Sequence, residues 1–460
     1  MITRDAIVVG AGAAGLAAAH ALAANGASVT VLERKPYPGG RAYSYAHPAL
    51  GEVVDSQHVL LGCCTNLIHL CEQAGAADKI SWYNEINFLE PGGRRTQLRP
   101  GVFPAPMHAA IDFLRAPMLS LADKLAISRG LTEFLHGCPK NDDESFAAWL
   151  NRTHQTEPAK RHFWGPVING ALNDSFENCS TKYAGQVFHE SFLKSAQAGS
   201  LGIPNVPLSE LYTAIASSII SNGGEVIFRA NVETITSLPN GCWYVRAGES
   251  EYETAALVLA ISYEQLQQLL PQLPQGDAAI NLAAKLTHFI HSSITTIHLW
   301  YDREITNLDH AALLDTSIEW IFNKSRIRHW PAERGTYVEL VISASKKQVE
   351  MSREEILTPA LRELESFFPA AHTATLLKSA VLKEAHATFS VTPGLDAFRP
   401  VQATEWPGLF LAGDFTATGW PSTMEGAVRS GYLVAEAVAK KKFLQPDLPA
   451  QGLMRLLVRD

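Results

Sequence analysis

The chain has 460 residues, enough for two or three folding units rather than one simple core. Hydrophobic residues make up 47% and charged residues 18%, which excludes a disordered chain. The net charge of −8 leaves no global basic field, so nucleic acid is not expected as a partner. The six cysteines show no CxxC pair and no metal-ligand spacing, so we expect a reducing cytoplasm and no metal site.

The first forty residues predict a strand, a glycine turn, a helix and a second strand. Residues 6–9 form a short apolar strand, the helix runs to about Ala24, and residues 28–33 form the next strand. Such a βαβ unit opens dinucleotide-binding folds. Residues 7–22 are apolar but lack a basic leader. No other window approaches the ~18 apolar residues of a membrane span, so no span is predicted.

The middle of the chain is less regular. Helical periodicity is expected at three places: between 100 and 138, over 145–156, and over 265–286. Successive β runs predict an antiparallel meander: 225–228 with 232–235, then 242–245, then 256–261. Two further strands are expected over 293–300 and 336–342. Near the C-terminus, a strand beginning at Leu409 leads into a helix over about 423–442.

Gly10, Gly12 and Gly15 form a GxGxxG motif between the first strand and the first helix. The first glycine permits a tight turn, the second lets amides approach a pyrophosphate, and the third allows close helix packing. The N-terminal turn of the helix, which includes Ala14, directs N–H groups at phosphates. Glu33 follows Gly15 by 18 residues, where a carboxylate accepts hydrogen bonds from an adenosine ribose. The pattern predicts a bound dinucleotide.

A second glycine turn indicates which dinucleotide is bound. Glu33 and Arg34 lead into Gly39-Gly40-Arg41, and this LERxxxxGGR extension resembles flavoproteins of the amine oxidase and phytoene desaturase superfamily. The resemblance implies FAD, and no second GxGxxG marks a separate nicotinamide site. It also implies that Asp414, after Gly413, binds a ribityl hydroxyl, and that Val232 offers its backbone to the adenine.

By the same resemblance, the C-terminal helix directs its N-terminus at the flavin pyrimidine ring. Ser422, Thr423 and Met424 stand at its start. Free N–H groups and the helix dipole there would stabilise negative charge on a reduced flavin. Glu425 is interpreted as an ordinary first-turn acid rather than a reacting group.

Nucleotide-type signals at both ends of the chain predict one cofactor domain assembled from separated segments. We expect an α/β fold, in which a Rossmann-like FAD-binding domain built from discontinuous segments carries an inserted α+β substrate-binding domain. The predicted boundaries are 1–85, 208–265 and 395–442 for the FAD-binding domain, 86–207 and 266–394 for the substrate domain, and 443–460 for a tail.

Three segments narrow the resemblance. Residues 54–63 (VDSQHVLLGC), 164–173 (WGP leading into ALN) and 409–431 (LFLAGDFTATGWPSTMEGAVRSG) are similar to signatures of hydroxysqualene dehydroxylases, also called squalene-associated FAD-dependent desaturases. Together with the N-terminus they span nearly the whole chain. The sequence departs from that pattern in places that bear on pocket shape: Ser56, Phe415, Trp420 and residues 385–389.

The resemblance implies that hydroxysqualene, a long-chain isoprenoid, is reduced to squalene by reduced FAD, whose electron donor the sequence does not name. An allylic carbon–oxygen bond ionises once hydroxide is protonated, so the pocket needs an apolar tunnel, a proton donor and aromatic faces that tolerate positive charge. His58 is the first candidate for the donor, because histidine changes charge near neutral pH. A structural role against the flavin is the alternative. His386 is a weaker candidate, and Asp55 is interpreted as structural.

Other activities stay open. An oxidative desaturase of carotenoid precursors would share the fold and the cofactor. A flavin-containing isoprenoid carrier would bind lipid without chemistry. An amine oxidase is less favoured, because no aromatic-cage pattern is visible in the substrate segments.

A substrate this apolar must come from a membrane. Residues 103–135 place Phe113, Leu114, Met118 and Leu121 among basic side chains, which is typical of an interfacial helix, and equally of a buried core helix. Lysines 440–442, before Phe443 and Leu444, suggest a weak contact with anionic lipid. We therefore expect a cytoplasmic protein, with peripheral contact at the inner face of the membrane.

Overall fold

The N-terminal βαβ unit forms as predicted. The computed structural model describes residues 1–458, and its first elements are β1 (Ile2–Val9), α1 (Ala13–Ala24) and β2 (Val29–Glu33). The two strands are parallel, and the centre of β1 is fully buried, as expected for a strand covered on both faces. The small side chains of α1 let helix α16 (Met424–Ala439) approach closely. A Cβ on Gly431 would lie 2.2 Å from the Ala14 carbonyl oxygen.

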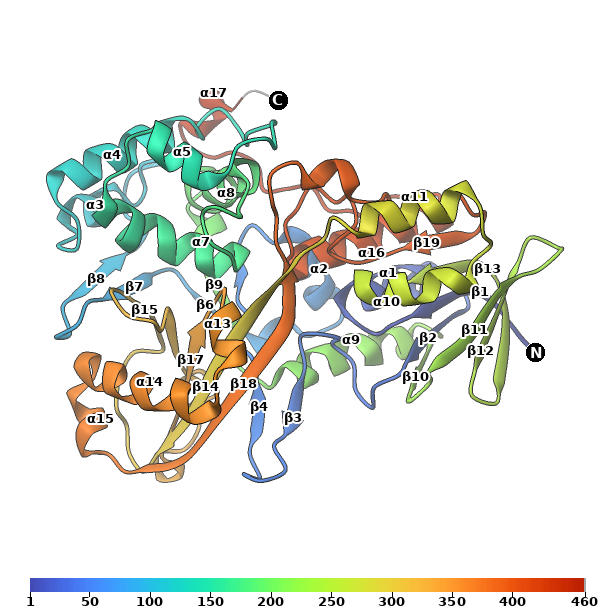
Figure 1. Cartoon of the computed structure of the whole chain (residues 1–460), viewed down its shortest axis with the longest axis horizontal. Helices are drawn as coiled ribbons and strands as arrows, with labels where there is room; N and C mark the ends of the chain where they lie inside the picture. Colours follow the sequence, from blue (N-terminus) through green and yellow to red (C-terminus); the bar gives the residue numbers. More distant parts are fainter. Residues whose placement is uncertain (459–460) are drawn as a thin grey trace.

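Seven strands from distant parts of the chain build the first sheet, at the right of Figure 1. Their order is β10-β2-β1-β13-β12-β11, and β19 pairs in parallel with β13. The added strands are β10 (Glu225–Phe228), β11 (Val232–Ser237), β12 (Trp243–Ala247), β13 (Ser250–Leu259) and β19 (Leu409–Leu411). All seven fall within the segments predicted for the FAD-binding domain, and the α/β fold class is confirmed.

The predicted meander is wrong in its first strand. β11, β12 and β13 do form an antiparallel meander, but β10 pairs in parallel with β2 at the opposite edge of the sheet. Arg229 adopts a left-handed conformation (φ 58°) where the chain leaves β10. Helix α9 (Leu208–Ser221), which packs on α1, precedes β10. β10 and β11 are therefore neighbours in sequence but not in the sheet. Hydrophobic periodicity does not indicate which strands pair.

The second sheet also has seven strands, in the order β18-β14-β17-β16-β15-β7-β8. The two predicted strands are β14 (His291–Tyr301) and β17 (Thr336–Ile342). The sequence did not indicate the other five: β7 (Ile86–Leu89), β8 (Arg95–Leu98), β15 (His310–Leu313), β16 (Trp320–Asn323) and β18 (Leu376–Phe389). All seven fall within 86–207 and 266–394. The long strand β18 runs from the lower left of Figure 1 toward the first sheet.

Two small sheets complete the strand arrangement, and one of them joins segments of the two predicted domains. One pairs β3 (Ser44–Ala46) with β4 (Val53–Asp55). The other has the order β5-β9-β6 and consists of β5 (Leu60–Leu61), β6 (Ile80–Tyr83) and β9 (Leu201–Pro204). Because β9 comes from the predicted substrate segment and its partners come from the predicted FAD segment, the boundaries near 85 and 207 stay predictions.

A lobe of short helices lies above the second sheet in Figure 1. Its helices are α3 (Ala110–Arg115), α4 (Leu121–Thr132), α5 (Phe146–Arg152), α6 (Glu157–Ala159), α7 (Gly165–Leu172) and α8 (Thr181–Val187). Further helices are α2 (Thr65–Gln73), α12 (Lys324–Ile327), α13 (Lys346–Glu350), α14 (Arg353–Phe367), α15 (Pro369–Thr373) and α17 (Met454–Leu457). Within residues 1–458, no helix is both long and apolar enough to cross a bilayer.

Prolines shorten two of the predicted helices. The periodic stretch 100–138 divides into α3 and α4 around Pro117, and Ser120 with Asp123 forms a capping box that starts α4. The stretch 265–286 divides into α10 (Tyr263–Leu269) and α11 (Asp277–Leu286) around Pro271 and Pro274. Proline lacks the backbone N–H that a helix interior needs, so each break has a local cause.

Candidate active site

A cavity of about 870 Å³ is lined by residues from both large sheets. One end carries the glycine turns, and the other carries apolar side chains of β7, β16 and β17. The predicted site residues that line it are Gly10, Gly12, Ala14, Glu33, Arg34, Gly40, Arg41, His58, Val232, Gly413, Asp414, Ser422, Thr423 and Met424. Gly15 is the one predicted residue that does not line the cavity.

The first glycine turn is shaped by close backbone contacts. Gly10 has φ 105°, and a Cβ there would lie 2.4 Å from the Ala260 carbonyl oxygen. A Cβ on Gly15 would lie 2.0 Å from the Gly10 carbonyl oxygen, so Gly15 serves helix packing rather than ligand contact. Gly12 is the N-cap of α1 and has no capping side chain. The first-turn N–H groups of α1 therefore lack intrahelical acceptors and fit a pyrophosphate.

Glu33 closes this end of the cavity. Its buried carboxylate accepts hydrogen bonds from the backbone N–H groups of Ala11 (2.7 Å) and Lys35 (2.8 Å). These two bonds hold the side chain in one orientation. Because a carboxylate has about four acceptor positions, two remain for ribose hydroxyls.

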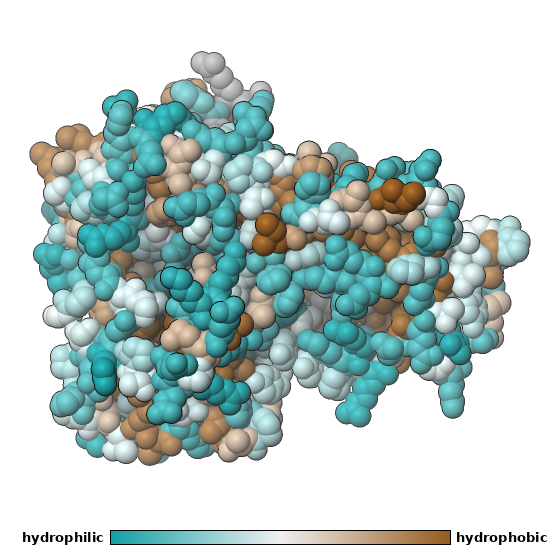
Figure 2. All heavy atoms as spheres, in the orientation of Figure 1, coloured by the Kyte–Doolittle hydropathy of each residue, from teal (hydrophilic) through white to brown (hydrophobic). Residues whose placement is uncertain are grey.

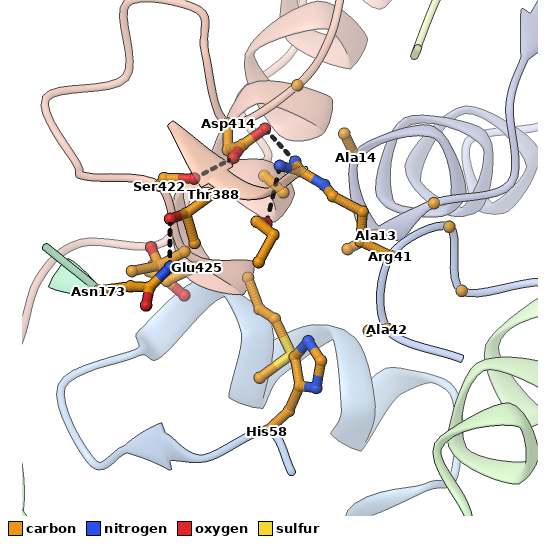
Figure 3. Close-up of a pocket in the computed structure, with 18 of the residues that line it drawn as sticks. Ala13, Ala14, Arg41, Ala42, His58, Asn173, Thr388, Asp414, Ser422 and Glu425 are labelled. Atoms are coloured by element: carbon orange, nitrogen blue, oxygen red, sulfur yellow. Dashed lines mark hydrogen bonds and ion pairs between the residues drawn. The ribbon is translucent and has the colours of Figure 1, made fainter. Parts of the chain in front are cut away.

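Arg41 and Asp414, 373 residues apart in sequence, meet across the cavity (Figure 3). Arg41 Nη2 lies 2.5 Å from Asp414 Oδ1, and the Ser422 hydroxyl donates to Asp414 Oδ2 at 2.6 Å. Arg41 Nη1 also donates to the Ala387 carbonyl oxygen of β18 at 3.2 Å. This ion pair joins the second glycine turn to the C-terminal strand, and it places a cation and a carboxylate where the resemblance expects FAD contacts.

The N-terminus of α16 lies beside that ion pair. Thr423 is its N-cap, and the Thr423 hydroxyl accepts a hydrogen bond from the Gly426 N–H at 3.1 Å. The Glu425 carboxylate is fully buried and accepts N–H groups from Asn66 (3.2 Å) and Leu67 (2.8 Å) at the start of α2. Burial raises the pKa of Glu425. Its carboxylate holds two helices together, which supports a structural role.

His58 lies on the opposite wall of the cavity from Asp414 in Figure 3. Its Nδ1 is 2.8 Å from the Ser56 carbonyl oxygen, which can only accept, so in the neutral ring Nδ1 carries the proton. Nε2 is then an acceptor and has no protein partner among residues 1–458. Burial lowers the pKa of His58, so the neutral form predominates near pH 7. His58 can accept a hydrogen bond readily, and it donates from Nε2 only when protonated.

A network of buried charges beside the second sheet supports the loop that carries His58. Lys324, at the start of α12, lies 3.1 Å from Asp55 Oδ1 and 3.0 Å from Glu339 Oε2, and all three side chains are at most 2% exposed. Arg328 donates to both Asp55 oxygens at 2.8 and 2.9 Å. Against the opposing effect of burial, these cations lower the pKa of Asp55. Asp55 therefore has the structural role that its sequence context suggested.

Gln57 connects this network to His58. The Gln57 backbone N–H donates to Glu339 Oε1 at 2.6 Å, and Lys324 Nζ donates to Gln57 Oε1 at 2.6 Å. The Gln57 amide in turn donates to the His58 carbonyl oxygen at 2.7 Å. Burial raises the pKa of Glu339 to about 7, although Lys324 opposes the shift. Lys324 and Glu339 are positioning residues that the sequence offered no signal for, because they are distant in sequence from residue 58.

Sequence reasoning also missed a polar pair in the cavity wall. Asn173 ends α7 in a left-handed conformation (φ 54°), and its amide donates to the Thr388 hydroxyl at 2.9 Å (Figure 3). Its Oδ1 accepts the Ala344 N–H at 2.8 Å. The sequence did offer a signal for Asn173, because this residue ends the segment 164–173 that resembles hydroxysqualene dehydroxylases. His386 lies at the cavity rim, half exposed, with Nδ1 3.2 Å from Glu264.

The fold brings together two potential metal-ligating groups that sequence spacing did not reveal. One consists of Glu264, His291 and His386 and is largely exposed, and the other is largely buried. Ligand atoms of Cys138, His189 and Glu190 lie within 4.8 Å of one another. Lys194 Nζ, however, donates to both Glu190 oxygens at 3.1 and 2.8 Å. A cation already neutralises this carboxylate, and burial raises the pKa of Cys138 to about 12.

Comparison with known proteins identifies the family. The sequence model of flavin-containing amine oxidoreductases matches residues 13–439. The chain belongs to this family. Its cofactor is FAD, and the protein is a FAD-dependent oxidoreductase. The GxGxxG turn, Glu33 and the α16 N-terminus fit that cofactor by their free donors and acceptors.

Among relatives, the 15-cis-phytoene desaturase of Synechococcus elongatus is 26% identical over 460 residues, which cover 95% of this chain and 96% of that protein. The zeta-carotene desaturase of Synechocystis is also 26% identical and covers 94% and 96%. Wild-type putrescine oxidase bound to putrescine has a TM-score of 0.72 at 18% identity, covering 96% of this chain and 100% of that one. Cyclohexylamine oxidase from Brevibacterium oxydans reaches 0.67 at 19% identity, with coverage of 95% and 99%. The two oxidase structures show the fold.

Proposed function

We propose that this flavoprotein reduces hydroxysqualene to squalene. The observation that carries the proposal is spatial. The three segments that resemble hydroxysqualene dehydroxylases, 54–63, 164–173 and 409–431, all contribute walls to the same cavity. They come from three separate parts of the chain. Because all three line one cavity, their resemblance supports a common function at that cavity.

The reaction balances with reduced FAD as the reductant. Bound FAD, when reduced, supplies a hydride ion, and the substrate needs one hydride and one proton. The allylic carbon–oxygen bond breaks, the oxygen takes the proton and leaves as water, and the carbon takes the hydride. The protein must therefore hold the alcohol, provide a proton to its oxygen, and exclude competing water from the cation.

His58 is suited to the alcohol. Neutral His58 offers Nε2 as an acceptor for the substrate O–H, and protonated His58 donates from the same atom to the departing oxygen. A hydrocarbon substrate has no atom that could use this nitrogen. The network of Gln57, Lys324 and Glu339 would keep the imidazole in place during both steps.

The walls beyond His58 suit an isoprenoid chain. The apolar lining includes Phe88, Phe192, Trp320, Phe322 and Val341. Aromatic faces attract a transient cation by about 0.5–2 kcal/mol each, while aliphatic neighbours keep water away.

Oxidative desaturation of a carotenoid-type polyisoprenoid is the second candidate. The relatives named as phytoene and zeta-carotene desaturases favour it. It would use the same cavity with electrons moving from substrate to oxidised FAD.

An anaerobic single turnover separates the two reactions. Protein whose FAD is chemically reduced is mixed with hydroxysqualene in detergent, followed by its flavin absorbance, and extracted for lipid analysis. We expect flavin reoxidation with one equivalent of squalene. A flavin that stays reduced, with the alcohol recovered unchanged, would overturn the proposal. Oxidised protein would then be mixed with phytoene, where flavin reduction would establish the desaturase.

A further inference from the structure

Exposed apolar side chains are concentrated at one end of the helical lobe. Of the seventeen large hydrophobic residues that are exposed among residues 1–458, eight lie within two short stretches. These eight are Val102, Phe103, Met107, Leu114, Leu121, Leu125, Leu453 and Leu456. Figure 2 shows hydrophobic surface at the upper left, where Figure 1 places α3 and α4. The other nine are scattered over the rest of the chain.

The two stretches are held together by hydrogen bonds. The Leu453 N–H donates to the Ala105 carbonyl oxygen at 2.9 Å, which places the start of α17 against the loop before α3. Lys124 Nζ donates to the Leu114 carbonyl oxygen at 2.8 Å, which joins α4 to α3. Residues 99–129 and 452–456 thus form one continuous surface, here called the lobe surface.

The lobe surface is basic although the chain as a whole is acidic. It carries Arg99, Arg115, Lys124, Arg129 and Arg455. Its two carboxylates have local partners: Asp112 pairs with Arg99, and Asp123 is buried in the capping box of α4. Exposed leucine and phenylalanine among cations is the combination that binds the interface of an anionic bilayer.

An aromatic column connects this surface to the cavity. Phe113 of α3 contacts Phe163, with ring centroids 5.9 Å apart, and Phe163 stacks on Phe188 at 5.8 Å. Phe188 contacts Phe192, 5.9 Å away, which lines the cavity. A second connection runs through the loop that begins at Arg99. This loop follows β8, and β8 pairs with the cavity-lining strand β7. The lobe surface therefore lies behind the apolar end of the cavity.

We propose that the lobe surface docks this enzyme on anionic lipid membranes, with α3, α4 and α17 in contact with the bilayer interface. The docking does not depend on which isoprenoid reaction the enzyme catalyses. The lysines at 440–442 do not belong to this surface. Lys441 donates to Asn25 at the end of α1, and Phe443 and Leu444 pack partly buried beside the first sheet.

Vesicle flotation of the flavin-loaded protein tests the proposal without any substrate. Vesicles of phosphatidylcholine alone are compared with vesicles of equal parts phosphatidylcholine and phosphatidylglycerol, at low and high salt. We expect at least about tenfold stronger partitioning to the anionic vesicles at low salt. The variant Leu121→Gln/Leu125→Gln, whose side chains are 69% and 64% exposed, should lose about tenfold. The variant Arg115→Gln/Arg129→Gln should lose the part of the vesicle binding that depends on salt concentration.

Ile280→Gln is the matched control, because Ile280 is 66% exposed on α11, far from the lobe surface in sequence, and should float like wild type. Retained flavin absorbance verifies that each variant folds. Wild-type protein that stays unbound with every vesicle, or leucine variants that float like wild type, would overturn membrane docking. A dimer in light scattering that the leucine variants dissociate, without flotation, would assign the surface to a second copy instead.

Discussion

The two ends of the cavity are constructed by different physical means. The cofactor end is made largely of backbone: glycine turns in which a Cβ on Gly10 or Gly39 would collide with a carbonyl oxygen, unpaired N–H groups at the start of α1, and one carboxylate held by two amides. The substrate end is made of side chains, including apolar ones of the second sheet, with Asp55, Lys324 and Glu339 buried together behind them. Backbone recognition requires few particular residues, whereas a buried charge network requires every partner.

This difference predicts how the two ends respond to change. The cofactor end should tolerate most substitutions outside its glycines and helix caps. Each such substitution should reduce the affinity for FAD only slightly. The substrate end should be sensitive to single substitutions, because a buried ion without its partner costs several kcal/mol.

His58→Ala should abolish turnover while leaving FAD in place. General acid–base groups contribute about 10²–10⁴ in rate, and His58 contacts the cavity without any cofactor-binding partner among residues 1–458. The measurement is single-turnover flavin reoxidation with the bound flavin quantified by absorbance. His386→Ala, at the half-exposed rim, is the control and should retain turnover. Turnover of His58→Ala within a few-fold of wild type would show that His58 is not the acid.

The pH profile sharpens the same prediction. Because burial lowers the pKa of His58, the protonated fraction declines as pH rises above that lowered value. A rate that depends on protonated His58 should therefore fall with rising pH across the neutral range, and the His58→Ala variant should lack this slope. A wild-type rate independent of pH between 5 and 8 would contradict the assignment.

The contrast between the two ends also explains what the sequence could predict. The GxGxxG turn, Glu33, Arg41 and Asp414 are local patterns whose spacing reflects one backbone geometry, and all line the cavity, with Gly15 as the packing glycine. Lys324 and Glu339 carry no local pattern. Their role depends on α12 and β17, which place Lys324 and Glu339 beside Asp55 although both are distant from it in sequence.

Sheet topology was similarly beyond reach. β10 looked like the first strand of a meander because nothing in its own residues records that it pairs with β2. The short strands β15 and β16 are nearly continuous apolar runs, which periodicity cannot distinguish from buried helix. The helix breaks in 100–138 and 265–286, by contrast, have a local signal in the sequence, namely Pro117, Pro271 and Pro274.

Lys324→Met should be the most destabilising single change in the substrate end. It leaves Asp55 with Arg328 alone and Glu339 with no cation, and removing one partner from a buried ion cluster costs about 3–5 kcal/mol. Urea unfolding measures the free energy change. The double variant Lys324→Met/Glu339→Gln removes the orphaned charge and should recover part of the loss. A double variant less stable than the single one would contradict the charge argument.

Glu339 should make stability depend on pH. Its folded pKa of about 7 exceeds the ordinary 4.5, so the folded state holds a proton that the unfolded state releases between these values. Stability should therefore be higher near pH 5 and fall as pH rises to about 7, by roughly 2 kcal/mol at 1.4 kcal/mol per pKa unit. The neighbouring His298, whose pKa burial lowers to about 3, stays neutral throughout this range.

Glu339→Gln provides the measurement. The difference in unfolding free energy between wild type and this variant should shrink at pH 5 and widen at pH 8, with the variant the more stable form at high pH. Comparing the two proteins at each pH cancels the contribution of the histidines to the pH dependence, because the histidines titrate in both proteins. An unchanged difference across this range would mean that Glu339 is ionised in the folded protein at every pH tested.

The smallest expected effect comes from comparing a helix cap at the cofactor end with a helix cap outside the cavity. Thr423 caps α16 at the cofactor end, and Ser352 caps α14 on the second sheet, each accepting an N–H three residues on. Replacing either by alanine should cost about 1 kcal/mol in unfolding free energy, because one N-terminal N–H loses its acceptor. Only Thr423→Ala should also weaken FAD binding, by a few-fold, since the N-terminus of α16 lines the cavity and that of α14 does not. FAD titration of both variants, with urea unfolding beside it, decides the matter. Equal FAD affinity in the two would mean that the α16 N-terminus contributes to the fold without contributing to the cofactor.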